Sequence, residues 1–173
     1  MKKTTLIGIF VLVAVLATAS MALAAGGGNF RTHLSGGNEV PARETLAQGQ
    51  AIFRLNADGT ELYFKLIATN IDNVVGAHIH VGAEGVNGPV VVPLFSATPG
   101  GGRQTGILSE GVITSASLVG PMAGKSLSDL MSEIEAGNTY VNVHTNDGVA
   151  PTNTGPGDFP GGEIRGQIHG GGQ

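Results

Sequence analysis

The chain has 173 residues, with nine Lys or Arg and thirteen Asp or Glu, so its formal net charge is −4 at pH 7. No basic patch offsets this charge, which argues against binding to nucleic acid or to anionic lipid. The sequence contains no cysteine, and this excludes disulfide bonds, thiol nucleophiles and iron–sulfur clusters.

Residues 1–24 have the pattern of a secretory signal peptide. Lys2 and Lys3 precede an apolar stretch at 6–16, and the Ala-Leu-Ala of residues 22–24 fits an A-x-A cleavage site. A retained membrane anchor is the alternative, but the cleavage site favours removal. We therefore expect an exported protein in the periplasm, on the cell surface or in the medium, without stable membrane insertion.

Cleavage after residue 24 leaves 149 residues, with seven basic and thirteen acidic side chains and a net charge of −6. That length suits one domain, expected at 30–169, between a flexible linker at 25–29 and a disordered tail at 170–173. Short apolar runs separated by glycines predict strands. The strands are expected at 30–35, 50–56, 62–66, 77–81, 90–95, 106–114, 139–145 and 163–168.

One segment has the pattern of a helix. Ser126 and Asp129 form a capping-box-like start, Gly137 can close the helix, and an apolar stripe lies between them. About eight short strands with one short helix predict an all-β, Greek-key β-sandwich. Residues 146–161 form a long loop rich in Pro, Gly, Asn and Thr, and loops of this length are usually functional or mobile.

Three of the five histidines lie in strand-like segments. Because side chains alternate along a strand, His78 and His80 share one face, and His144 lies on the face opposite its neighbouring valines. The strand at 163–168 presents Glu163 and Arg165 on its polar face. If these strands are neighbours, the three imidazoles converge.

Imidazole nitrogens are suitable ligands for zinc and copper, so His78, His80 and His144 are candidate metal ligands. Glu163 is a weaker candidate, either as a fourth ligand or as a group that orients an imidazole. The alternative is structural: hydrogen-bonded histidines on a sheet, with Arg165 pairing with Glu39 or Glu163 to pin a loop. We favour a non-enzymatic role because the sequence has no nucleophile elbow, phosphate-binding loop or H-E-x-x-H pair.

Five ordered blocks between residues 30 and 168 resemble the CHRD (chordin) domain family. The blocks are LSGGNEVP (34–41), GAHIHVG with GVNGPVV (76–91), the segment 127–136, GNTYVNVHT (137–145) and PGGEIRGQI (160–168). The family is named after chordin, an extracellular antagonist of bone morphogenetic proteins, and similar stand-alone domains occur in secreted microbial proteins. The resemblance implies one exported domain. Growth-factor antagonism is not carried over, because chordin's cysteine-rich modules are missing.

A looser similarity, confined to the H-x-H strand, is to copper/zinc superoxide dismutase. Three functions therefore stay open. The first is a non-enzymatic extracytoplasmic module that binds an unknown protein or surface ligand. The second is a copper- or zinc-binding protein, either a carrier or a dismutase-like redox protein. The third is a structural component of an envelope or filament that assembles through exposed sheet edges.

Overall fold

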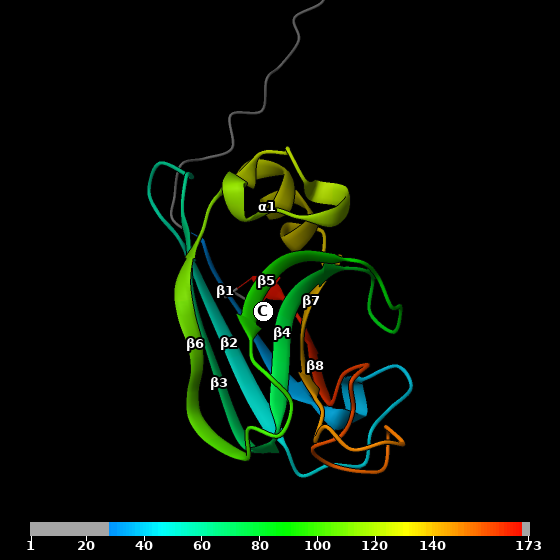
Figure 1. Cartoon of the computed structure of the whole chain (residues 1–173). Helices are drawn as coiled ribbons and strands as arrows, with labels where there is room; N and C mark the ends of the chain where they lie inside the picture. Colours follow the sequence, from blue (N-terminus) through cyan, green and yellow to red (C-terminus); the bar gives the residue numbers. More distant parts are fainter. Residues whose placement is uncertain (1–27, 171–173) are drawn as a thin grey trace, which may run out of the picture.

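The computed structural model describes residues 28–170, in which nine strands and one α-helix account for most of the ordered elements (Figure 1). The helix, α1, spans Leu127–Glu135, and three single-turn 3-10 helices lie in connections. The strands are Asn29–Ser35 (β1), Gln48–Leu55 (β2), Leu62–Asp72 (β3), Val74–Val81 (β4), Val90–Ser96 (β5), Arg103–Ile113 (β6), Thr139–Thr145 (β7), Ile164–Gln167 (β8) and His169–Gly170 (β9).

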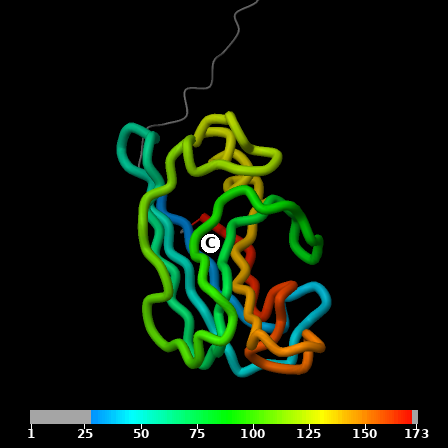
Figure 2. Tube along the Cα trace, viewed as in Figure 1, coloured from blue at the N-terminus to red at the C-terminus, as the bar shows by residue number. Residues whose placement is uncertain are grey.

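All the paired strands belong to one antiparallel sheet with the order β5-β4-β7-β8-β1-β2-β3-β6, and β9 pairs with β1. The sheet curls until its two ends approach each other, as the trace in Figure 2 shows. There the Ser109 hydroxyl of β6 donates a hydrogen bond of 2.7 Å to the Leu94 carbonyl of β5. The predicted all-β sandwich with one helix is confirmed, and its sheet nearly closes into a barrel.

The core lies inside this curled sheet because inward positions alternate with outward ones. In the β2–β3 hairpin the inward pairs are Ala51 with Leu66 and Phe53 with Phe64, as the alternating pattern predicts. The amphipathic helix α1 closes one end of the barrel (Figure 1). Its buried side chains are Leu127, Leu130, Met131 and Ile134, and the predicted capping box is present between Ser126 and Asp129.

The ends of the folded part differ slightly from the predicted boundaries. Asn29, placed in the predicted linker at 25–29, opens β1, and Gly170, placed in the predicted tail at 170–173, pairs with β1 through β9. Backbone pairing along β1 orders both residues. The predicted signal peptide at 1–24 lies outside the described residues. Within them, no helix has the length and apolar character needed to cross a membrane.

Two long segments meet at the barrel end opposite α1 (Figure 1). One connects β1 to β2 and the other connects β7 to β8. The Arg43 guanidinium donates to the Asn153 carboxamide across them, and the Thr45 hydroxyl donates to the Glu163 carboxylate. A third loop, between β4 and β5, also folds over the outside of the sheet. These three loops cover the outer face of β4 and β7, on which His78, His80 and His144 lie.

Candidate metal centre

Strands β4, β7 and β8 are neighbours, so their outward side chains form one polar surface. In the antiparallel register, His78 lies opposite Asn142, and Asn142 lies opposite Arg165 on its other side. His80 lies opposite Tyr140. The residues between them in sequence are apolar and fill the core: Ala77, Ile79, Val141, Val143 and Ile164. The period-2 pattern therefore separates core and polar residues on all three strands.

The structure brings His78, His80 and His144 together, as strand alternation predicts. One ring nitrogen from each residue lies within 4.8 Å of the other two. His78 Nδ1 and His144 Nε2 are 3.0 Å apart. Zn–N bonds of about 2.0–2.1 Å in tetrahedral geometry place ligand nitrogens roughly 3.4 Å from one another. The spacing of the three nitrogens is therefore close to that of ligands on a single ion, which would replace the hydrogen bond between His78 and His144.

Backbone carbonyls fix the orientation of two of these imidazoles. His80 Nδ1 lies 2.9 Å from the Gly88 carbonyl oxygen, and His144 Nδ1 lies 2.9 Å from that of Pro160. A carbonyl oxygen only accepts, so each Nδ1 carries the proton and each Nε2 keeps its lone pair. His80 Nε2 is buried and has no hydrogen-bond partner. This is the arrangement that orients imidazoles in metal sites.

The three imidazoles are neutral at pH 7. Burial, with His144 and His80 nearby, lowers the pKa of His78 to about 4. Burial also lowers the pKa of His80 and of His144, although their hydrogen bonds to carbonyls oppose the shift. Neutral imidazole is the form that binds a metal ion. His78 remains partly exposed, so one side of the cluster is open to solvent.

A stack of side chains beside the cluster holds the β4–β5 loop on the sheet. The Tyr140 ring lies against His80 with 4.8 Å between centroids and 10° between planes, and the Arg165 guanidinium lies 3.4 Å from the Tyr140 centroid. Arg165 donates to the Asn87 side chain and to the carbonyls of Ala83 and Val86. Arg165 thus pins a loop, and this loop supplies the Gly88 carbonyl to His80.

The ion pairs predicted for Arg165 do not form. Within residues 28–170, the pairs closer than 4.0 Å are Lys65–Glu110 and Arg103–Asp72. Glu39 is nonetheless buried close to Arg165. Burial raises the pKa of Glu39 to about 7, although Arg165 and Arg43 favour its ionised form. Its Oε1 atom has no hydrogen-bond partner.

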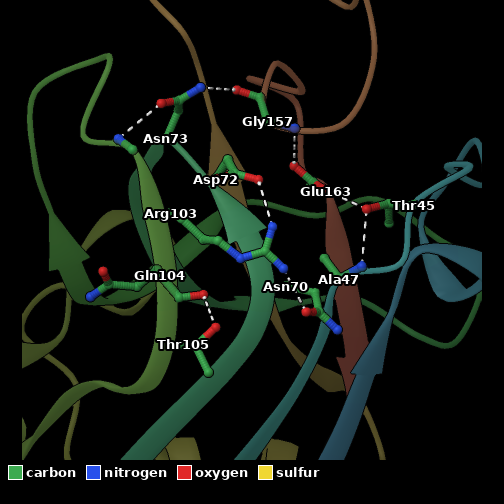
Figure 3. A network of polar contacts seen from close by, with 11 residues as sticks. Thr45, Ala47, Asn70, Asp72, Asn73, Arg103, Gln104, Thr105, Gly157 and Glu163 are labelled. Carbon is green, nitrogen blue, oxygen red and sulfur yellow. Dashed lines mark hydrogen bonds and ion pairs between the residues drawn. The ribbon is translucent and has the colours of Figure 1, made fainter.

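The structure places Glu163 outside the histidine cluster. Its fully buried carboxylate accepts hydrogen bonds from the Thr45 hydroxyl (2.6 Å), the Thr145 hydroxyl (2.7 Å) and the Gly157 amide (2.8 Å). Figure 3 shows it pointing between Thr45 and Gly157. Glu163 lies just before β8 begins at Ile164, and its three donors come from two loops and from the end of β7. It therefore joins the two loops and is not available as a fourth ligand.

Sequence reasoning missed four groups around the cluster. The carbonyls of Gly88 and Pro160 give no sequence signal, because every residue carries a carbonyl. Tyr140 and Asn142 were visible on the correct face, since they alternate with valines, but their contacts depend on loop positions. The other two histidines, His33 and His169, are exposed.

Comparison with known families matches residues 30–168 to the CHRD domain. Comparison with curated proteins and with solved structures finds no significant match. The match covers essentially all of the part that the structure describes, and it includes the three histidines. The chain belongs to the CHRD-domain family.

Proposed function

We propose that this protein is a non-enzymatic extracytoplasmic binding module that holds one zinc or copper ion at His78, His80 and His144. The observation that carries the proposal is the buried Nε2 lone pair of His80, which has no partner while its Nδ1 is held by Gly88. A buried polar atom without a partner costs about 1–3 kcal/mol. A metal ion shared with the other two imidazoles would remove that cost.

The donor set favours zinc or copper over harder cations. Three neutral imidazoles suit Zn²⁺ and Cu²⁺, whereas Ca²⁺ and Mg²⁺ prefer oxygen ligands. A bound ion would also link β4 to β7 and stabilise the loops that hold the rings. The domain has no cysteine, so a metal ion would be its only cross-link between these strands.

A metal titration of the purified protein tests the proposal. The protein is stripped with a chelator, then titrated with Zn²⁺ or Cu²⁺ in competition with a chromophoric chelator, and the bound metal is measured by elemental analysis. We expect one equivalent of metal and a rise in melting temperature. His80→Ala and His144→Ala should each abolish stoichiometric binding.

The exposed histidines provide matched controls. His33→Ala and His169→Ala remove imidazoles that lie outside the cluster, so both variants should bind metal like the parent protein. Absence of binding by the parent protein would refute the metal centre, and so would binding that survives His80→Ala. In that case the imidazoles are hydrogen-bonded structure, and light scattering would test the third alternative, assembly through sheet edges.

Export is tested separately. Expression of the full chain in a bacterial host, followed by fractionation and mass spectrometry, should give an extracytoplasmic product that begins at Ala25. A product that keeps residues 1–24 and sediments with membranes would contradict the exported, soluble form.

A further inference from the structure

We propose that Asn142 supplies the fourth ligand of the metal ion through its carboxamide oxygen, with its amide nitrogen on the side of Glu39 and Gly162. This inference rests on the proposed metal centre and extends it from three nitrogen ligands to three nitrogens and one oxygen. Asn142 is 4% exposed. Its side chain is therefore removed from bulk water and must find its partners inside the protein.

The register places Asn142 beside the cluster. It lies directly opposite His78 on β4, two residues before His144 on β7, and on the same outward face as both. Side chains directly opposite each other in an antiparallel pair have Cβ atoms about 4.5–5.5 Å apart. The Asn142 side chain also lies near enough to His80 to oppose the fall in the pKa of that imidazole.

The surroundings of Gly162 show which way the carboxamide points. A Cβ atom built on Gly162 would lie 2.5 Å from Glu39 Oε1 and 2.7 Å from Asn142 Nδ2. The carboxylate oxygen and the amide nitrogen therefore face the same small space, which exists because residue 162 has no side chain. Nδ2 thus lies on the side of Gly162 and Glu39, and Oδ1 lies on the other side of the carboxamide.

Three buried acceptors in this region have no donor, and one of them is Glu39 Oε1. Asn142 Oδ1 and His80 Nε2 are both buried without a hydrogen-bond partner, and both carry lone pairs, because His80 Nδ1 donates to Gly88. A flipped carboxamide would offer Nδ2 to His80, but it would turn Oδ1 towards Glu39 Oε1, a buried oxygen that already lacks a donor. A cation between Oδ1 and the imidazoles satisfies both Oδ1 and His80 Nε2 without the flip.

The resulting donor set determines which ions the site prefers. Three imidazole nitrogens and one carboxamide oxygen suit the borderline divalent ions Zn²⁺ and Cu²⁺. Cu⁺ prefers soft sulfur ligands, and this site has none within reach. The centre should therefore hold divalent ions and bind Cu⁺ poorly.

The experiment uses Zn²⁺, which is diamagnetic, and follows the protein at pH 8 by nuclear magnetic resonance. In ¹⁵N-labelled protein, the side-chain NH₂ pair of Asn142 is assigned by its loss in Asn142→Asp. Addition of one equivalent of Zn²⁺ should shift this pair more than the NH₂ pair of Asn138, which lies in the turn between α1 and β7 and donates to Glu133. Asn142→Leu should weaken Zn²⁺ binding about 10- to 100-fold, and Asn142→Asp should restore it.

The outcomes separate this inference from the proposed function. Zn²⁺ binding that leaves the Asn142 pair unmoved, with Asn142→Leu as tight as the parent protein, overturns the Asn142 ligand and keeps the three-histidine centre. No Zn²⁺ binding by the parent protein overturns both. If Asn142→Leu does not fold, the NH₂ pair of Asn142 in the parent protein gives the answer: a shift on Zn²⁺ addition supports the Asn142 ligand, and no shift overturns it. Gly162→Ala gives an independent check, because its methyl group displaces the carboxamide and should weaken binding by a similar factor.

Discussion

Two outward faces of the same curled sheet have opposite environments. On β4, β7 and β8, the outward residues His80, Asn142 and Arg165 are buried. On β2, β3 and β6, large outward side chains are exposed: Ile52 is 42% exposed, Tyr63 is 39% exposed and Val112 is 44% exposed. Polar side chains are thus buried on the outer face of β4, β7 and β8, which we call the covered face. Apolar side chains are exposed on the outer face of β2, β3 and β6, which we call the open face. Strand alternation decides which side chains point outward, and the loops decide which of them meet water.

The comparison also shows what holds the loops in place. Arg165 and Tyr140 hydrogen-bond to the β4–β5 loop, whereas the open face has an ion pair between Lys65 and Glu110 that reaches no loop. Hydrogen bonds to a buried charged group are worth about 1.5–3 kcal/mol, and exposed ion pairs usually less than about 1 kcal/mol. Matched substitutions on the two faces should therefore differ strongly in effect.

The largest difference is expected between the two arginines that lie over tyrosines. Arg165→Met leaves the carbonyls of Ala83 and Val86 without their donor and removes the contact with Tyr140, so it should lower the free energy of unfolding by about 3–5 kcal/mol. Arg54 lies 5.6 Å from the Tyr63 ring on the open face, and Arg54→Met should cost about 0.5 kcal/mol. Urea unfolding measures both, and equal losses would contradict the comparison.

The next effect is a pH dependence that belongs to the covered face. Burial raises the pKa of Glu39 from 4.5 to about 7, so the folded state favours the protonated carboxyl. Its contribution to stability is complete below pH 4.5 and is lost as the pH rises through 7, by about 3 kcal/mol at pH 8. In metal-free protein, Glu39→Gln should therefore gain stability relative to the parent chain between pH 4.5 and pH 8.

The control for this pH dependence is Glu110→Gln on the open face. The Glu110 side chain is 57% exposed, so its substitution should change stability by a small amount that varies little over the same pH range. The lowered pKa values of the histidines affect parent and variants alike and cancel in the difference. A Glu39→Gln difference that stays constant from pH 4.5 to pH 8 would show that the carboxyl is ionised at its ordinary pKa.

A smaller effect is expected for the two tyrosine hydroxyls. The Tyr140 hydroxyl accepts from the Gly88 amide at 3.0 Å. Tyr140→Phe leaves this partly buried amide without its acceptor and should lower the free energy of unfolding by about 1–2 kcal/mol. The Tyr63 hydroxyl donates to Glu61 at 2.8 Å in a solvent-exposed hydrogen bond, and water can replace this bond. Tyr63→Phe should therefore change stability by less than about 0.5 kcal/mol. Thermal unfolding of the two variants provides the comparison.

The histidine cluster was predictable because two independent regularities agree. The period of a strand places His78 and His80 on one face, and the valines around His144 identify the opposite face of its strand. The adjacency of β4 and β7 is a matter of topology, which the sequence analysis left open and the structure shows. The positions of the three histidines thus depend on strand geometry, which local sequence patterns encode well.

The surroundings of the cluster were not predictable in the same way. Glu163 has the residue type of a metal ligand, but Thr45 and Gly157 occupy its oxygens, and these donors come from loops 118 and 6 residues away in sequence. Strand alternation placed Asn142 on the correct face, but its residue type did not indicate a particular role. Its proposed role depends on the space that the glycine at 162 leaves beside Glu39. Loop positions depend on the sum of many weak contacts, and no periodicity records them.

The smallest effect expected is the coupling between Lys65 and Glu110, and it tests how far the open face behaves as a solvated surface. Their charged atoms are 3.1 Å apart, with 45% and 57% of the side chains exposed. A double-mutant cycle with Lys65→Ala and Glu110→Ala should give about 0.5 kcal/mol at low salt and less at 1 M salt, where screening acts within about 3 Å. A coupling above about 1.5 kcal/mol that resists salt would mean that this face is shielded from water in solution. Both faces would then be covered and the contrast between them would be lost, since a bare sheet surface cannot protect an ion pair from screening.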